Sequence, residues 1–247
     1  MNLSKRSFLD VALVLFLVWY LTSCSVLNPI LYDDGLEGNK ETLPVEVSVL
    51  QEMAQYCVDV YENGTTVGKL VYKVYYSEGV TIIAIRGTAN AENVVSDIDA
   101  RFYHDRTAET LFHRGFHDAS LKIYDSLKKE HKDKTIYLTG HSLGGAIAQI
   151  LSIWYTKDGH IAQVYTFGAP KIAVSGWWKF GIEHFRVAFD KDPVPFVPPF
   201  PFVHSGIKID PITLDWVDGG EEHRASFGQI DGRDHSIDGY LKELLKH

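Results

Sequence analysis

A chain of 247 residues, 45% of them hydrophobic, can fill one sizeable core but is short for two full α/β domains. A net charge of −8 without a long Lys/Arg-rich run excludes the basic footprint of a nucleic-acid-binding protein. The only cysteines, Cys24 and Cys57, exclude a disulfide framework and a cysteine-rich metal site.

The first segment in chain order is predicted to be an export signal. Lys5 and Arg6 precede an apolar run over 11–21, which has the length of a signal-peptide core and is short for a membrane span. The following Leu21-Thr22-Ser23-Cys24 resembles the lipobox of bacterial lipoproteins. This resemblance implies cleavage before Cys24 and acylation of Cys24, which would anchor the protein to the bacterial envelope. Ser25 favours the outer membrane if the source is Gram-negative, and a signal anchor or ordinary secretion are the alternatives.

Three segments are therefore predicted. Residues 1–23 form a lipoprotein signal peptide, and 24–45 form the lipidated cysteine and a tether rich in turn-forming residues such as Asn28-Pro29. Residues 46–247 form one globular domain.

The globular part begins with a predicted β-hairpin. The runs 67–76 and 80–85 are rich in β-branched and aromatic residues, and Ser77-Glu78-Gly79 between them has the composition of a turn. The second run is almost wholly apolar, which is typical of a strand covered on both faces.

Helices and strands then alternate. Apolar residues at helical spacing predict a helix over 115–132 and another that ends at Gly159. Short strands are predicted at 135–139, 164–167 and 185–189. This alternation predicts an α/β fold with a mostly parallel sheet.

The turn before the second helix carries Gly140-His141-Ser142-Leu143-Gly144. It fits G-x-S-x-G, in which a nucleophilic serine occupies a strained strand-to-helix turn between small residues. The predicted strand before it and helix after it supply the context that this pattern requires. Ser142 is therefore predicted to be a nucleophile, which needs an acid and a histidine base located after it in the chain.

The chain from about residue 71 to residue 240 resembles the class 3 lipases, the family of the fungal triacylglycerol lipases. Six motifs in family order carry the resemblance: IRGT at 85–88, HRGF at 113–116, GHSLGG at 140–145, TFGAP at 166–170, DPVP at 192–195, and His235-Ser236 followed by Tyr240. The resemblance implies a single-domain α/β-hydrolase fold, with a mostly parallel central sheet flanked by helices, that needs no cofactor and no metal.

The family pattern assigns Asp192 as the acid and His235 as the base. Asp192 stands directly ahead of a segment ending in Val-Pro, whereas its competitor Asp190 is more typical of a turn cap. His204 matches a structural segment of the family. In the resulting triad of Ser142, Asp192 and His235, the carboxylate orients the imidazole, which takes the serine proton.

An oxyanion hole requires two backbone N–H groups. Leu143, the residue after the nucleophile, is expected to supply one. The resemblance assigns the other to Thr88; for Arg86-Gly87-Thr88 an ordinary strand-end turn is the alternative.

Other segments of the family pattern are less decisive. The family carries a lid at 89–111, where charged residues crowd the apolar stripe of this chain and argue against interfacial activation. The proline-rich stretch 194–203 is predicted to form an acyl-pocket wall, and His113 and Phe116 are predicted to pack in the core. Trp177-Trp178 fits core burial or contact with a membrane surface.

The predicted function is hydrolysis of carboxylic ester bonds of lipids through an acyl-enzyme, with an acyl-lipid or ester substrate and a membrane surface as partners. Phospholipase A1 activity, short-chain or feruloyl-type ester hydrolysis, and a silent lipid-binding lipoprotein are alternatives. Retention of Ser142, Asp192 and His235 argues against the silent protein. Substrate chain length and oligomeric state stay open.

Overall fold

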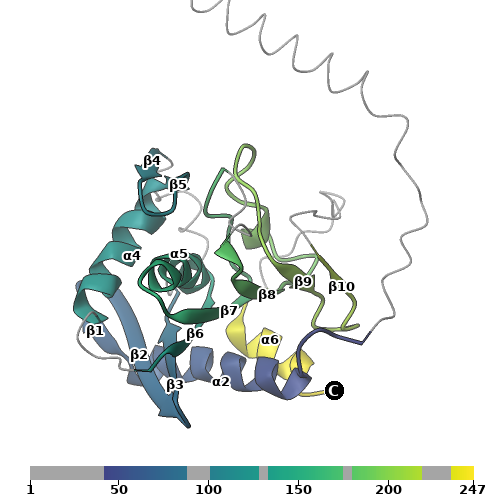
Figure 1. Ribbon diagram of the computed structural model, residues 1–247. Coiled ribbons are helices and arrows are strands. Elements are labelled where there is room, and N and C mark those ends of the chain that lie inside the picture. The colour runs from purple at the N-terminus through teal and green to yellow at the C-terminus, as the bar shows by residue number, and fades with distance from the viewer. Residues whose placement is uncertain (1–41, 88–100, 128–132, 175–179, 219–234) are drawn as a thin grey trace, which may run out of the picture. The chain divides into compact units, whose positions relative to one another are not determined.

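A twisted sheet with helices on both faces forms the centre of the computed structural model (Figure 1). The structure describes residues 42–87, 101–127, 133–174, 180–218 and 235–247. The strands of the main sheet are β1 (Thr65–Val67), β2 (Leu70–Ser77), β3 (Val80–Ile85), β6 (Thr135–His141), β7 (Ile161–Phe167), β8 (Glu183–Val187), β9 (Ile207–Ile209) and β10 (Trp216–Val217). Their spatial order is β1-β2-β3-β6-β7-β8-β9-β10.

The sheet is mostly parallel, as predicted. Strands β3, β6, β7, β8 and β9 run parallel, and the antiparallel strands β1, β2 and β10 lie toward its two edges. The predicted hairpin is β2–β3, in which Ser77 pairs with Val80. Glu78 and Gly79 both have positive φ, 37° and 82°, as a two-residue type I′ turn requires.

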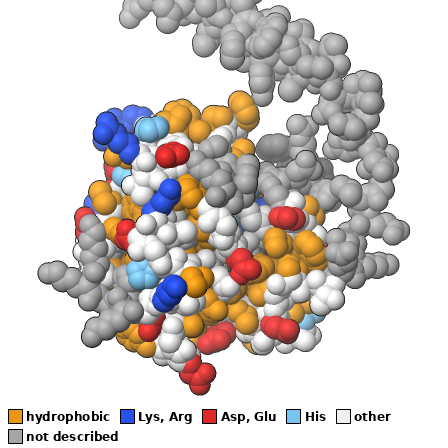
Figure 2. Space-filling view, in the orientation of Figure 1, with side chains coloured by type: hydrophobic (Ala, Val, Ile, Leu, Met, Phe, Trp, Pro, Cys, Tyr) orange, Lys and Arg blue, Asp and Glu red, His pale blue; other side chains and the backbone are white. Residues whose placement is uncertain are grey.

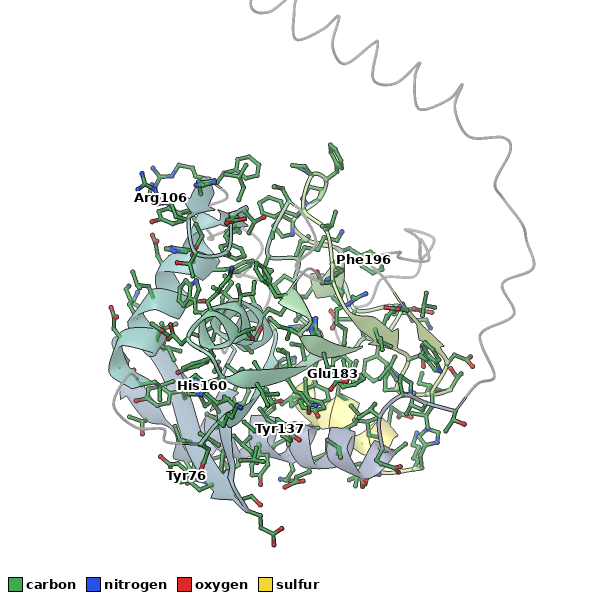
Figure 3. The ribbon with its side chains drawn as sticks, in the orientation of Figure 1. Tyr76, Arg106, Tyr137, His160, Glu183 and Phe196 are labelled. Atoms are coloured by element: carbon green, nitrogen blue, oxygen red, sulfur yellow. The ribbon has the colours of Figure 1, made fainter. Side chains whose placement is uncertain are left out.

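Two helices cover each face of the sheet. Helices α4 (Arg114–Leu127) and α5 (Leu143–Lys157) pack on one face, and α2 (Val47–Asn63) and α6 (Ile237–Leu244) pack on the other. Side chains alternate between these layers along each strand, so Val164 of β7 packs with α5 while the next residue, Tyr165, packs with α2. Tyr137 of β6 likewise points toward the α2 layer (Figure 3).

Several sequence predictions lie outside the described residues. They are the signal peptide, Cys24 and most of the tether, Thr88, the first part of the lid segment, and Trp177-Trp178. The predicted helix 115–132 is observed as α4 up to Leu127, and residues 128–132 are also outside. No helix in the described ranges is long and apolar enough to cross a membrane.

The end of the predicted lid segment forms a hairpin of β4 (Phe102–Asp105) and β5 (Thr110–His113). Ala173 bridges this hairpin to the proline-rich segment, because it pairs with Phe112 on one side and Val203 on the other. Figure 2 shows hydrophobic side chains gathered on the surface in this upper region. The large exposed ones on the two segments are Phe102, Tyr103, Leu111 and Phe200.

A buried carboxylate clamps the hairpin to the helices beneath it, while Arg106 next to it projects outward (Figure 3). Asp105 Oδ2 accepts a hydrogen bond from Trp154 Nε1 at 2.9 Å and lies 3.4 Å from His117 Nε2. The ring of Tyr103 stacks on His117 with centroids 3.8 Å apart. The clamp therefore joins β4 to α4 and α5.

Opposing influences set the pKa values in this clamp. Burial raises the pKa of Asp105, but hydrogen bonds from His117, Trp154 and backbone N–H groups lower it to about 2. Burial lowers the pKa of His117, but hydrogen bonds to Asp105 and Asp118 outweigh it and raise that pKa above its ordinary value. The protonated histidine is thus stabilised in the folded state.

The clamp predicts a pH-dependent contribution to stability. Because the folded pKa of His117 lies above the ordinary value of 6.5, the contribution of His117 is complete below that pH and is lost as pH rises through the folded pKa. We expect His117→Gln to lower the free energy of unfolding more near about pH 5.5 than near about pH 9. Urea unfolding of both proteins at the two pH values measures this difference, and an equal effect at both would contradict the clamp.

Candidate active site

The predicted nucleophile occupies a strained turn between β6 and α5. Ser142 has φ 57° and ψ −127°, a conformation that non-glycine residues rarely adopt. Its N–H donates to Phe167 O at 3.0 Å, and its carbonyl accepts the N–H groups of Gly145 and Ala146. These bonds hold the strained residue at the carboxyl edge of the sheet.

The glycines around Ser142 permit backbone contacts that no side chain would allow. A Cβ on Gly144 would lie 2.0 Å from the carbonyl oxygen of Ile85, and one on Gly140 would lie 2.3 Å from the carbonyl carbon of Gly144. The start of α5 therefore rests directly on the end of β3. This is the tight geometry that the G-x-S-x-G pattern predicts.

The structure brings Asp192 and His235 together across 43 residues of sequence. Asp192 Oδ2 lies 2.7 Å from His235 Nδ1, and both side chains are almost completely buried. The other carboxylate oxygen accepts the N–H of Val194 at 2.9 Å. Because an ionised carboxylate only accepts hydrogen bonds, Nδ1 carries the proton and Nε2 is left with the basic lone pair.

Ser142 and the side chain of His235 are both buried, and the ring of His141, the residue before Ser142, packs on that of His235. Ser142 Oγ and His235 Nε2 have no hydrogen-bond partner within the described part of the chain, so no direct bond joins them. Catalytic hydrogen bonds are often long before substrate binds and tighten in the reacting complex.

Two residues of the carboxylate site had no role assigned to them from the sequence. Tyr240 donates its hydroxyl to Asp192 Oδ2 at 2.6 Å. Gly168 has φ +56°, and a Cβ there would lie 2.5 Å from Asp192 Oδ2 and 3.1 Å from His235 Nδ1. Both residues belong to motifs of the family pattern, and this membership was the only feature of the sequence that could have pointed to them.

The competing candidates lie elsewhere. Asp190 is largely exposed and pairs with Lys208 at 2.6 Å, where a turn cap was expected. His204 is buried and donates through Nε2 to Pro195 O at 2.7 Å, in line with a structural role. His113 and Phe116 are buried, as predicted for core residues.

A second histidine packs on His235. The ring of His141 lies 4.5 Å from that of His235, and its Nδ1 lies 3.0 Å from the hydroxyl of Tyr61 on α2. Burial, assisted by the neighbouring His235, holds the pKa of His141 well below its ordinary value. His141 is therefore neutral at physiological pH.

Of the two residues predicted to form the oxyanion hole, Leu143 lies within the described residues and Thr88 lies outside them. Leu143 is the first residue of α5, where a backbone N–H has no acceptor within the helix. Gly87, just before Thr88, lies close enough that a Cβ there would be 3.0 Å from Ser142 Cβ. Among the described side chains, no three His, Cys, Asp or Glu residues converge as metal ligands.

Comparisons with known proteins show which chains are similar to this one. The family model described as lipase (class 3) matches residues 82–202. A secreted mono- and diacylglycerol lipase of Fusarium solani is 26% identical over 156 residues, which cover 56% of this chain and 44% of that protein. A secreted mono- and diacylglycerol lipase of Malassezia globosa is 28% identical over 216 residues, which cover 68% of this chain and 70% of that protein. The chain thus spans less than half the length of the first of these relatives.

The solved structure of a lipase from Rhizopus microsporus var. chinensis superposes with a TM-score of 0.61 at 20% identity, covering 76% of this chain and 85% of that one. The sheet, the strained serine turn and this likeness define an α/β-hydrolase fold. Within that fold, the chain is similar to the class 3 lipases over residues 82–202.

The close packing at the turn predicts opposite effects of two Gly→Ala substitutions in helices. Gly144→Ala forces Cβ against Ile85 and is expected to lower the free energy of unfolding by on the order of 3 kcal/mol. Gly239→Ala, on α6, meets only Ser236 Cβ at 3.8 Å and is expected to stabilise the protein by about 1 kcal/mol. Urea unfolding of both variants tests this, and equal stability would contradict the tight turn.

Proposed function

We propose that this protein is a serine hydrolase that cleaves the carboxylic ester bonds of lipids through an acyl-enzyme. Ser142 is the nucleophile, His235 the general base and Asp192 the acid that orients it. The observation that carries the proposal is the buried 2.7 Å contact of Asp192 with His235, together with a serine held at φ 57° whose neighbour His141 packs on His235. The family relatives named as lipases support the same reaction class.

The geometry supports a two-step acyl transfer. His235 Nε2 takes the Ser142 proton as Oγ attacks the ester carbonyl, and the imidazolium then donates that proton to the leaving alcohol. A water deprotonated by His235 releases the acid and restores the serine. Asp192 stabilises the imidazolium while Tyr240 and Val194 hold the carboxylate in place.

The oxyanion of each tetrahedral intermediate needs fixed donors. We assign these to the backbone N–H groups of Leu143 and Thr88. The start of α5 also contributes its positive dipole end at this point.

Two features favour a lipid over a polar ester. Phe200 is 75% exposed and Phe102 is 48% exposed, and both lie on segments joined through Ala173, one of which follows Asp192 directly. Ser142 itself is 0% exposed. An apolar surface around a covered site suits a substrate with acyl chains.

Replacement of the nucleophile tests the proposal. We expect Ser142→Ala to lower hydrolysis of para-nitrophenyl esters by at least about 1,000-fold while leaving the melting temperature nearly unchanged, because only the attacking oxygen is lost. Ser152→Ala is the matched control: Ser152 is also fully buried, on α5, and donates its hydroxyl to Gln149 O in the same helix.

The substrate range separates the alternatives. Esters of rising chain length, followed by emulsified triacylglycerol and phospholipid, are assayed with both serine variants. Ser142-dependent turnover of long chains supports a lipase, and turnover confined to short chains supports an esterase. Turnover that survives Ser142→Ala contradicts the triad, and no turnover on any ester favours a silent lipid-binding protein.

We also propose that the chain is exported and anchored through acylated Cys24. The charged start, the apolar run over 11–21 and the lipobox-like residues before Cys24 support anchoring. The relatives named as secreted support export in general.

Phase partitioning tests the anchor. When the full chain is produced in a bacterium, we expect it to enter the detergent phase and to take up labelled palmitate, whereas Cys24→Ser abolishes both. Cys57→Ser is the control, because Cys57 is buried and hydrogen-bonded to Thr139. Equal labelling of the wild type and Cys24→Ser would contradict acylation at this residue.

A further inference from the structure

A tyrosine from helix α2 reaches the turn that holds Ser142. The hydroxyl of Tyr61, on α2, lies 3.0 Å from His141 Nδ1, between residues 80 positions apart in the sequence. It also lies where the end of β3 approaches, since a Cβ on Gly87 would be 2.8 Å from the Tyr61 hydroxyl and 2.7 Å from His141 O. Tyr61 therefore touches both segments that flank the nucleophile.

The hydroxyl of Tyr61 forms hydrogen bonds to both of these segments. A backbone hydrogen bond from Gly87 acts on Tyr61, and an N–H group can only donate, so the tyrosine oxygen is the acceptor there. Burial raises the pKa of Tyr61 to about 12, so its hydroxyl keeps its proton. The hydroxyl is linked by a hydrogen bond to Nδ1 of the neutral His141 ring, and either atom can be the donor.

His141 in turn supports the histidine that bonds to Asp192. Its ring packs on His235 with centroids 4.5 Å apart, and it is buried to 5% exposure, so it has little room to rotate. Tyr240, on α6, approaches the ring of His141 to 6.2 Å while its own hydroxyl donates to Asp192. The imidazole of His235 is thus confined by His141 on one side and by the carboxylate on the other.

We propose that Tyr61 is a positioning residue for ester hydrolysis, which acts through His141 to hold the imidazole of His235 in its reactive orientation. This role rests on the proposed function of His235 as the base. Tyr61 ties together the Gly87 end of β3, the nucleophile turn and the base, and a neutral His141 adds no competing positive charge beside the imidazolium. Tyr61 lies outside residues 82–202, the segment that matches the family model.

Removal of one hydroxyl tests the role. We expect Tyr61→Phe to lower kcat for a para-nitrophenyl ester about 10-fold with KM changed less than about 2-fold, because a misplaced catalytic group slows the chemical step more than binding. Tyr75→Phe is the matched control: Tyr75 is also half-buried, packs against the same Val60 cluster and donates its hydroxyl to Asp59 instead.

A double-mutant cycle shows whether Tyr61 acts through His141. His141→Phe keeps a ring against His235 but removes Nδ1, the hydrogen-bond partner of Tyr61. We expect the double variant Tyr61→Phe, His141→Phe to be no slower than His141→Phe alone, because both changes break the same link. Additive losses in kcat overturn the proposal, since they show that Tyr61 acts on its own.

The outcomes separate this proposal from the function on which it rests. Ser142-dependent turnover of the wild type is measured first, and its absence overturns the proposed function together with this role. With that turnover present, equal kcat values for Tyr61→Phe and Tyr75→Phe overturn only the role of Tyr61. Melting temperatures are compared in parallel: a kcat loss that comes with a melting temperature well below that of Tyr75→Phe overturns a specific positioning role.

Discussion

The whole site depends on one close approach of backbone to backbone. Gly144, in the first turn of α5, sits so near the carbonyl of Ile85 that a methyl group would collide with it. This contact fixes where α5 begins relative to β3 and β6, and so it determines the angle at which the chain turns at Ser142. Strain of about 1–3 kcal/mol at such a residue persists only where surrounding bonds over-determine it. The sheet bond to Phe167 and the first helical bonds of α5 supply that restraint.

The parallel sheet explains why distant residues can meet at this turn. Parallel strands end at the same edge, so the loops after β6, β7 and β8 gather there. Ser142 follows β6, Gly168 follows β7, and Asp192 lies in the loop after β8. His235 comes from farther along the chain, directly before α6, and that helix returns to the sheet and places Tyr240 on the same carboxylate.

Much of this could be predicted from sequence because the informative patterns are local. The apolar run of β3, the G-x-S-x-G turn and the helical spacing of α5 each lie within a few residues, and they gave the sheet and the serine turn. Helix α2 was not predicted, although Leu50, Met53, Ala54, Cys57 and Val60 form its buried face at helical spacing. The hairpin β4–β5 was also not predicted. Its charged residues are typical of an exposed loop, and the sequence does not indicate that Asp105 is buried among hydrogen-bond donors.

Contacts between segments far apart in the sequence could not be predicted, because no local sequence pattern indicates them. The hydrogen bond of the Tyr240 hydroxyl, the approach of Gly168 to Asp192 and the pairing of Tyr61 with His141 depend on how the helical layers pack on the sheet. The histidine–carboxylate pair was anticipated from family motifs, whereas spacing alone could not choose Asp192 over Asp190. In the structure the two aspartates differ in burial: Asp190 pairs with Lys208 at the surface, and the buried Asp192 accepts hydrogen bonds from three donors.

The helical layer of α2 and α6 covers the sheet and also contributes side chains that contact the site. These two helices pack on each other, and Gln51 of α2 donates to the carbonyl of Leu244 in α6 at 2.9 Å. Tyr61 and Tyr240 extend from this layer to the two sides of the imidazole of His235, one through His141 and one through Asp192. A shift of either helix would therefore move a restraint on the proposed base, even though neither helix carries the nucleophile. The precision of the site thus depends on packing between the N-terminal and C-terminal helices, which lie on either side of the segment that matches the family model.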